Sequence, residues 1–118
     1  MTDPFSLDTI KSEFNEETEM WVLQDTTSKK YVTIPHPKYP GRNPIHFFMR
    51  REDAEDVLKK ILDVNWALRN RNISPTKVKL LRACRDIAAD KTKGNADGFV
   101  VHPPNEVYEF FHQKKPVT

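Results

Sequence analysis

The sequence predicts an α+β fold: a small, mainly antiparallel sheet of three to five strands covered by two or three helices. An apolar run of strand length, residues 45–49, ends at two arginines, and an acidic helix start follows at once. Other short apolar runs are separated by polar turns, as strands are. The 118 residues leave room for one hydrophobic core. We therefore expect one domain, with an acidic N-terminal segment at 1–19 and a frayed tail at 114–118.

The first part of the chain predicts a helix, a hairpin and a loop. Ser6 suits the N-cap of a short amphipathic helix. Residues 20–24 and 30–34 are typical of two strands joined by a polar turn, because the second run alternates from one face to the other. Residues 35–44 contain four prolines and a glycine, which disfavour both a helix and a regular strand.

The middle of the chain predicts a buried strand and the best-formed helix. Residues 45–49 are apolar almost throughout, which indicates a central strand covered on both faces. The helix begins near Arg51 and continues toward Trp66 or Leu68, with acids in its first turns that favour the helix dipole. Its apolar stripe comprises Ala54, Val57, Leu58, Ile61 and Leu62. We expect Trp21, Trp66 and most phenylalanines in the core.

The last part predicts a helix, a strand and a final helix. Ser74 and Pro75 match the N-cap and first position of a helix that ends near Gly94. The alternative prediction for part of residues 77–81 is a short strand. Residues 98–102 are typical of a further strand, and the prolines that follow them open the last helix.

Composition indicates where the protein resides. No apolar stretch approaches the roughly 20 residues of a membrane-spanning helix, so we expect no membrane span. The first residues lack the pattern of a signal peptide, and a lone Cys84 cannot form an internal disulfide. Both features favour a cytoplasmic protein.

Charge is divided unevenly along the chain. Residues 1–25 hold seven acids and one base, a net charge of −6, whereas residues 69–93 hold eight bases and two acids, a net charge of +6. Three interpretations follow: an acidic segment lies on a basic surface, a basic surface awaits a polyanion, or two solvated faces differ in sign.

The residue types that carry chemistry form no recognisable motif. The histidines 36, 46, 102 and 112 lack metal-ligand spacing, although His46 and His102 lie in or beside strands that can be neighbours. Cys84 falls on an apolar helix stripe, where an inert thiol is usual. The acids Glu52, Asp53, Glu55 and Asp56 suit a helix N-terminus, and three glycines make no phosphate-binding loop. We therefore expect no catalytic residue, no metal and no cofactor.

Two binding hypotheses remain. The proline-stiffened loop displays His36, Tyr39 and Arg42, a format suited to contact with another protein, although a rigid connector is the alternative. The second hypothesis is an accessory protein that binds nucleic acid or another polyanion through its basic region. Its candidate residues are Arg69, Arg71, Lys79, Arg82 and Arg85. Neither pattern specifies the oligomeric state.

A family resemblance supports the first hypothesis. The helix start at 51–55 and the segment at 98–107 resemble one half of the Tic-twenty-two-like family, and the pattern is similar to SseB-type α+β domains. The former are chloroplast and cyanobacterial proteins tied to protein import or chaperoning. The resemblance implies a chaperone-like or protein-interaction module, with a cyanobacterial origin. The shared positions Phe47, Phe48, Ala54 and Leu58 are architectural and imply no binding residue.

Overall fold

The computed structural model describes residues 5–36, 39, 41–90 and 98–104. The chain forms a short helix, a strand, and then the predicted strand–helix junction. In order, the elements are α1 Leu7–Glu13, β1 Glu19–Asp25, β2 Ile45–Phe48, α2 Arg51–Val64, the 3-10 turn η1 Trp66–Asn70, β3 Ile73–Lys79, α3 Leu80–Ala89 and β4 Phe99–His102.

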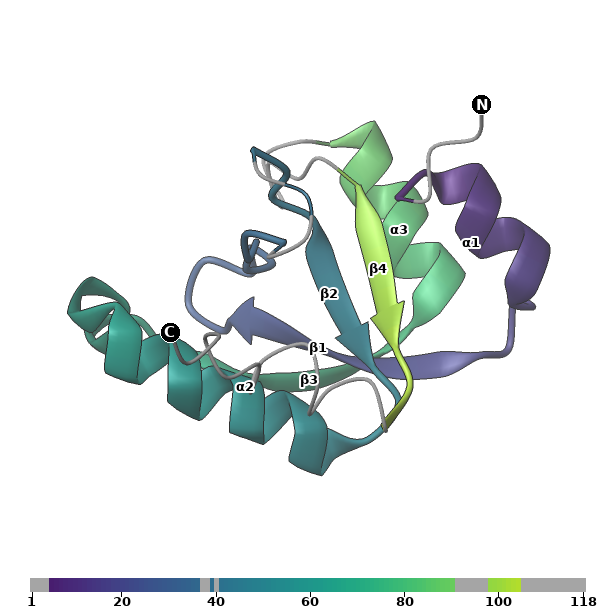
Figure 1. The fold of residues 1–118 in the computed structure, drawn as a ribbon. Coiled ribbons are helices and arrows are strands. Elements are labelled where there is room, and N and C mark those ends of the chain that lie inside the picture. The colour runs from purple at the N-terminus through teal and green to yellow at the C-terminus, as the bar shows by residue number, and fades with distance from the viewer. Residues whose placement is uncertain (1–4, 37–38, 40, 91–97, 105–118) are drawn as a thin grey trace, which may run out of the picture.

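The four strands form one mixed sheet in the order β3-β1-β2-β4. β1 pairs antiparallel with both β2 and β3, whereas β2 and β4 run parallel. Helix α2 covers one face of the sheet, and α1 and α3 cover the other (Figure 1). The α+β prediction, with its mainly antiparallel sheet, is therefore confirmed.

Strand β2 is buried at every position and separates two hydrophobic cores. Ile45 and Phe47 pack among residues of α1 and α3, and Phe48 packs against Ala54 and Val57 of α2. Successive side chains of a strand point to opposite faces, so this one strand supplies both cores. Its prediction as a central, doubly covered strand is confirmed.

Helix α2 begins where its sequence predicts. Arg50 has extended backbone and no side-chain cap, but its guanidinium donates two hydrogen bonds to the buried Asp53 carboxylate, at 3.0 and 3.1 Å. The regular helix ends at Val64, and Asn65 caps the 3-10 turn by accepting from the Ala67 N–H. The predicted continuation past Val64 therefore exists as this tighter turn.

The helix predicted from Ser74 and Pro75 exists as α3, but its predicted start is wrong. The alternative, a short strand in part of residues 77–81, is confirmed. Residues Ile73–Lys79 form strand β3 at the edge of the sheet, and α3 begins only at Leu80. Pro75 lies opposite Leu23, whose carbonyl accepts instead from the Val32 N–H at 3.0 Å, on the side away from β3. Pro75 thus occupies an outward position where the ladder needs no N–H, which is where an edge strand tolerates proline.

Other expectations are met in part. Ser6 caps α1 as predicted, accepting from the Thr9 N–H. The expected strand at 30–34 is reduced to two isolated bridges, Gln24 with Tyr31 and Thr33 with Ile45.

The predicted helix end near Gly94, the last helix and the tail at 114–118 lie outside the described residues. Across the described ranges, no helix is both long and apolar enough to cross a membrane.

The acidic N-terminal segment lies against the basic surface. Glu16 pairs with Arg85, Glu17 with Lys79 at 3.0 Å, and Glu19 with Lys77 at 3.7 Å. These pairs are exposed, so solvent and salt screen them and each adds little stability. Of the three interpretations of the charge division, the structure supports an acidic segment lying on a basic surface.

Gly98 provides a test of the contact between the N-terminal segment and β4. Its φ is +134°, and an added Cβ would lie 2.5 Å from the Phe5 carbonyl oxygen. We expect Gly98→Ala to lower the free energy of unfolding by about 3 kcal/mol, measured by urea denaturation, because backbone strain and the clash act together.

Gly41 is the matched control. It also has a positive φ, +86°, but nothing lies within 4 Å of its added Cβ. Gly41→Ala should therefore cost only the backbone strain, about 1 kcal/mol. Equal losses in the two variants would contradict the close packing of Phe5 on Gly98.

Candidate functional site

Three buried histidines meet on the α2 side of the sheet, at the β2–β4 pair. We call His36, His46 and His102 the histidine cluster; they are between 1% and 8% exposed. The parallel register sets His46 opposite Val100 and Phe48 opposite His102, so the two strand histidines share one face. His46 Nδ1 lies 2.7 Å from His102 Nε2, and His46 Nε2 lies 2.8 Å from the Ile34 carbonyl oxygen. The strands that carry His46 and His102 are neighbours, as the sequence analysis allowed.

The hydrogen bonds of His46 define its tautomer. A carbonyl oxygen only accepts, so His46 Nε2 carries the proton and donates to Ile34. A neutral His46 then has an unprotonated Nδ1, which accepts from the N–H at His102 Nε2. The two rings are inclined by only 6° with centres 5.0 Å apart, so they lie nearly edge to edge and the bond is nearly in line.

Aromatic rings enclose the cluster. His36 contacts the rings of Phe5 and Tyr39 at centroid distances of 5.2 and 4.9 Å, and it lies 6.2 Å from His46. Phe48 packs on His102 at 5.4 Å. The N-terminal segment, the 35–44 loop, β2 and β4 therefore meet around these imidazoles.

Burial keeps the strand histidines neutral. Loss of hydration lowers the pKa of His46 to about 4, with the Ile34 hydrogen bond opposing and His36 adding to the effect. Burial followed by the proximity of His46 and His36 lowers the pKa of His102 to about 3. Both imidazoles are therefore neutral hydrogen-bonding groups at neutral pH.

The cluster is not arranged to hold a metal ion. Two Zn–N bonds of about 2.0–2.1 Å at a tetrahedral angle separate their nitrogens by more than 3 Å, whereas the facing nitrogens of His46 and His102 lie 2.7 Å apart. Over the described ranges, no group of three or more histidine, cysteine, aspartate or glutamate side chains is placed to ligate a metal.

Among the other candidate reactive groups, Cys84 is buried and two of the four α2 acids are ion-paired. Cys84 is fully buried in α3, and burial raises the pKa of its thiol to about 12, far from the thiolate that a nucleophile needs. Of the α2 acids, Asp53 binds Arg50 and Glu55 binds Arg51 at 2.9 Å. These pairings fit the expected role of the acids at the start of a helix.

The described part of the proline-rich loop turns one of its predicted residues inward. The Tyr39 N–H donates to the His36 carbonyl, and the Arg42 N–H donates to the Tyr39 carbonyl. His36 is only 8% exposed, so it is not displayed as the sequence suggested, whereas Tyr39 is 46% exposed. Arg42 lies over the Phe5 ring at 4.9 Å. Tyr39 and Arg42 remain at the surface of this loop.

The predicted polyanion-binding residues fall into two groups, one toward each end of β3. Arg69 and Arg71 precede β3, and Lys79, Arg82 and Arg85 follow or end it, so the seven-residue strand separates the two groups by about 20 Å. In the second group, Lys79 and Arg85 are ion-paired with Glu17 and Glu16.

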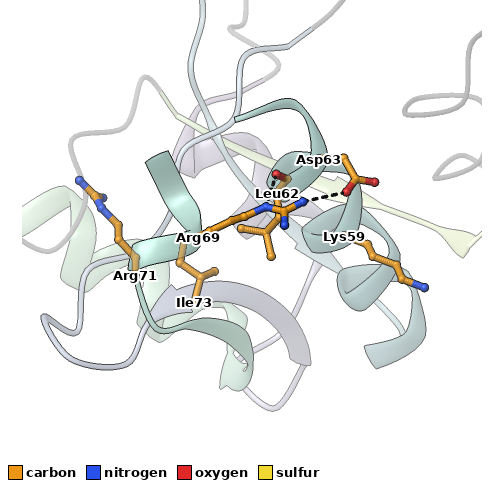
Figure 2. A pocket seen from close by; sticks show the side chains of 6 residues that line it. All are labelled: Lys59, Leu62, Asp63, Arg69, Arg71 and Ile73. Carbon is orange, nitrogen blue, oxygen red and sulfur yellow. Dashed lines mark hydrogen bonds and ion pairs between the residues drawn. The ribbon is translucent and has the colours of Figure 1, made fainter. Parts of the chain in front are cut away.

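A surface that sequence reasoning missed lies at the end of α2. Trp66, which we expected in the core, is 71% exposed, and the Arg69 guanidinium lies over its ring at 3.9 Å. Beside it is a hollow of about 350 Å³ between α2, η1 and β3. Its lining residues are Lys59, Leu62, Asp63, Arg69, Arg71 and Ile73 (Figure 2). We call Trp66 and this hollow the Trp66 surface.

No protein-family model matches the chain, and no curated protein matches it in sequence.

The histidine cluster predicts a loss of stability in acid. A folded-state pKa below the unfolded value of 6.5 means that the unfolded chain takes up protons first. The free energy of unfolding is therefore intact above pH 6.5 and falls as the pH drops from 6.5 toward 4. Two such histidines give a slope of about 3 kcal/mol per pH unit, measured by urea denaturation across this range.

His102→Gln isolates the contribution of the pair. Glutamine retains an N–H donor for His46 Nδ1 but does not titrate. We expect the slope between pH 6.5 and 4 to fall by about half in this variant. Parallel pH profiles for the variant and the wild type would show that His102 is not a buried neutral group.

Proposed function

We propose that this protein is a non-catalytic protein-interaction module that binds its partner through the Trp66 surface. One observation carries the proposal: a tryptophan 71% exposed to solvent and stacked with an arginine, beside an open hollow. Tryptophan and arginine dominate the energetic centres of protein interfaces. Burying an indole on a partner removes a large apolar area from water, which favours association.

The arginine of this surface is ordered before binding. The Arg69 Nε–H donates to the Leu62 carbonyl at 3.1 Å, its guanidinium pairs with Asp63 at 3.3 Å, and it stacks on Trp66. Three anchors restrict a side chain that otherwise samples many rotamers. Less conformational entropy is therefore lost when a partner covers it.

The proline-rich loop offers a second, smaller contact surface. Tyr39 is half exposed and Arg42 lies close by on Phe5, so an aromatic ring and a guanidinium are again presented together. A cytoplasmic site of action, a chaperone-like role and the resemblance to Tic-twenty-two-like proteins are part of this proposal.

Nucleic-acid binding is the weaker alternative. Arg82 and Arg85 are both exposed on α3, and Lys79 directly precedes that helix. However, Glu16 and Glu17 already neutralise two of these three bases. The double variant Arg82→Glu with Arg85→Glu tests the alternative: loss of binding to a labelled oligonucleotide, without unfolding, would favour it over the proposal.

The proposal predicts that Trp66→Ser impairs retention of a protein partner. Proteins retained by the tagged wild type from its native host are identified by mass spectrometry, purified and titrated against each variant. We expect Trp66→Ser to weaken binding about 30-fold, since truncating a central aromatic residue costs about 2 kcal/mol.

Tyr39→Ser is the matched control, because it removes an exposed aromatic ring at the other surface. It should leave the affinity within about twofold, a change below 1 kcal/mol. Circular dichroism verifies that both variants are folded. Full binding by Trp66→Ser, with loss in Tyr39→Ser, would move the interface to the proline-rich loop.

A further inference from the structure

The hollow of the Trp66 surface has an apolar floor and cationic ends. Leu62 and Ile73 supply the floor, and the Arg69–Asp63 ion pair crosses above Leu62 (Figure 2). The charged groups of Lys59 and Arg71 point away from each other, on opposite sides of this pair. A cationic group therefore lies on either side of the apolar residues of the lining.

The residues that line the hollow carry an excess of positive charge. Three of its residues are basic and one is acidic, and that single carboxylate, Asp63, is already engaged by Arg69. Within the part of the chain that the structure describes, Lys59 and Arg71 form no ion pair. Two cations at the ends of the hollow thus remain available to an incoming anion.

We propose that this hollow binds an extended acidic segment of a partner protein, with an aliphatic side chain on Leu62 and Ile73 and carboxylates at Lys59 and Arg71. The inference rests on the proposed protein-interaction function and specifies the chemistry of the partner. Carboxylates that alternate with apolar side chains along an extended chain match the order cation, apolar floor, cation.

A compact anion fits the hollow less well. Phosphate is held by donors that converge on one point, whereas Lys59 and Arg71 diverge across the apolar floor. Two anionic groups separated by a hydrophobic group satisfy both ends at once. The arrangement therefore favours a peptide over an isolated phosphate.

A nucleic-acid strand also fits less well. Single strands bind where bases stack on open aromatic rings, but one face of Trp66 is covered by the Arg69 guanidinium at 3.9 Å.

Fluorescence anisotropy of short labelled peptides on the full chain tests the inference. The first peptide alternates aspartate and leucine, the second replaces every aspartate by asparagine, and the third replaces every leucine by serine. We expect the first to bind at least about tenfold more tightly than either of the others, because one lost charge contact or one lost apolar contact is worth about 1.4 kcal/mol. Its affinity should fall as salt is raised, since the contacts are exposed.

Two charge reversals provide the matched comparison. Arg71→Glu lies in the hollow and should weaken binding of the first peptide about tenfold. Arg82→Glu changes the net charge equally, but Arg82 lies on α3, outside the lining. The affinity of this variant for the first peptide should stay within about twofold of the wild type. Both residues are exposed, so neither reversal should unfold the chain.

Failure of the inference can be told apart from failure of the proposed function. Equal binding of the aspartate and asparagine peptides, or no saturable binding below about 1 mM, would overturn the acidic partner. If Trp66→Ser nevertheless releases the natural partner and Arg71→Glu does not, the interaction function stands and the partner is not acidic at this site. Binding of an oligothymidylate that is tighter than the first peptide and weakened by Arg71→Glu would overturn the inference in favour of nucleic acid.

Discussion

The packing of strand β2 on both of its faces is the constraint on which the other elements depend. All four of its side chains are buried, and they alternate between the core beneath α1 and α3 and the core beneath α2. A strand in this position leaves no solvent-facing place for a polar group, yet His46 is one of the four. The cost of burying its ring is offset because both nitrogens are hydrogen-bonded, one to Ile34 and one to His102. The two hydrogen bonds of His46 thus connect β2 to β4 and to Ile34, directly before the proline-rich loop.

The parts of the fold that were predictable from sequence are those in which neighbouring residues determine the outcome. The apolar run of β2, the acidic first turn of α2 and the Ser6 cap are local signals, and each element forms where expected. Strand β3 was expected only as an alternative over part of residues 77–81, because Ser74 and Pro75 carry an equally local signal for a helix. Pairing with β1 makes this segment a strand, because the N–H that Pro75 lacks would face outward, away from β1. That pairing is a long-range property that a linear pattern does not contain.

The site was less predictable, for a related reason. His46 and His102 were recognised as neighbours because each lies in an identifiable strand, but their in-line hydrogen bond depends on the parallel register of β2 and β4. Trp66 was assigned to the core from its size, whereas the Asn65 cap turns the chain into a 3-10 turn and directs the indole outward. His46, His102 and Cys84 lie in the interior, whereas Trp66 lies at the surface. The exposed tryptophan is the feature on which the proposed function rests.

The parallel alignment of β2 and β4 has a consequence for biosynthesis. The two strands belong to distant parts of the chain, and the Phe99 N–H that faces outward donates to the carbonyl of Phe5. During synthesis β2 leaves the ribosome long before β4. Until β4 follows, the backbone groups of β2 on that edge have no strand to pair with. Contacts between such distant segments close slowly and leave apolar surface uncovered in the interval. The β2–β4 pairing is therefore completed only after residue 102 has been synthesised, which makes this part of the sheet late to form.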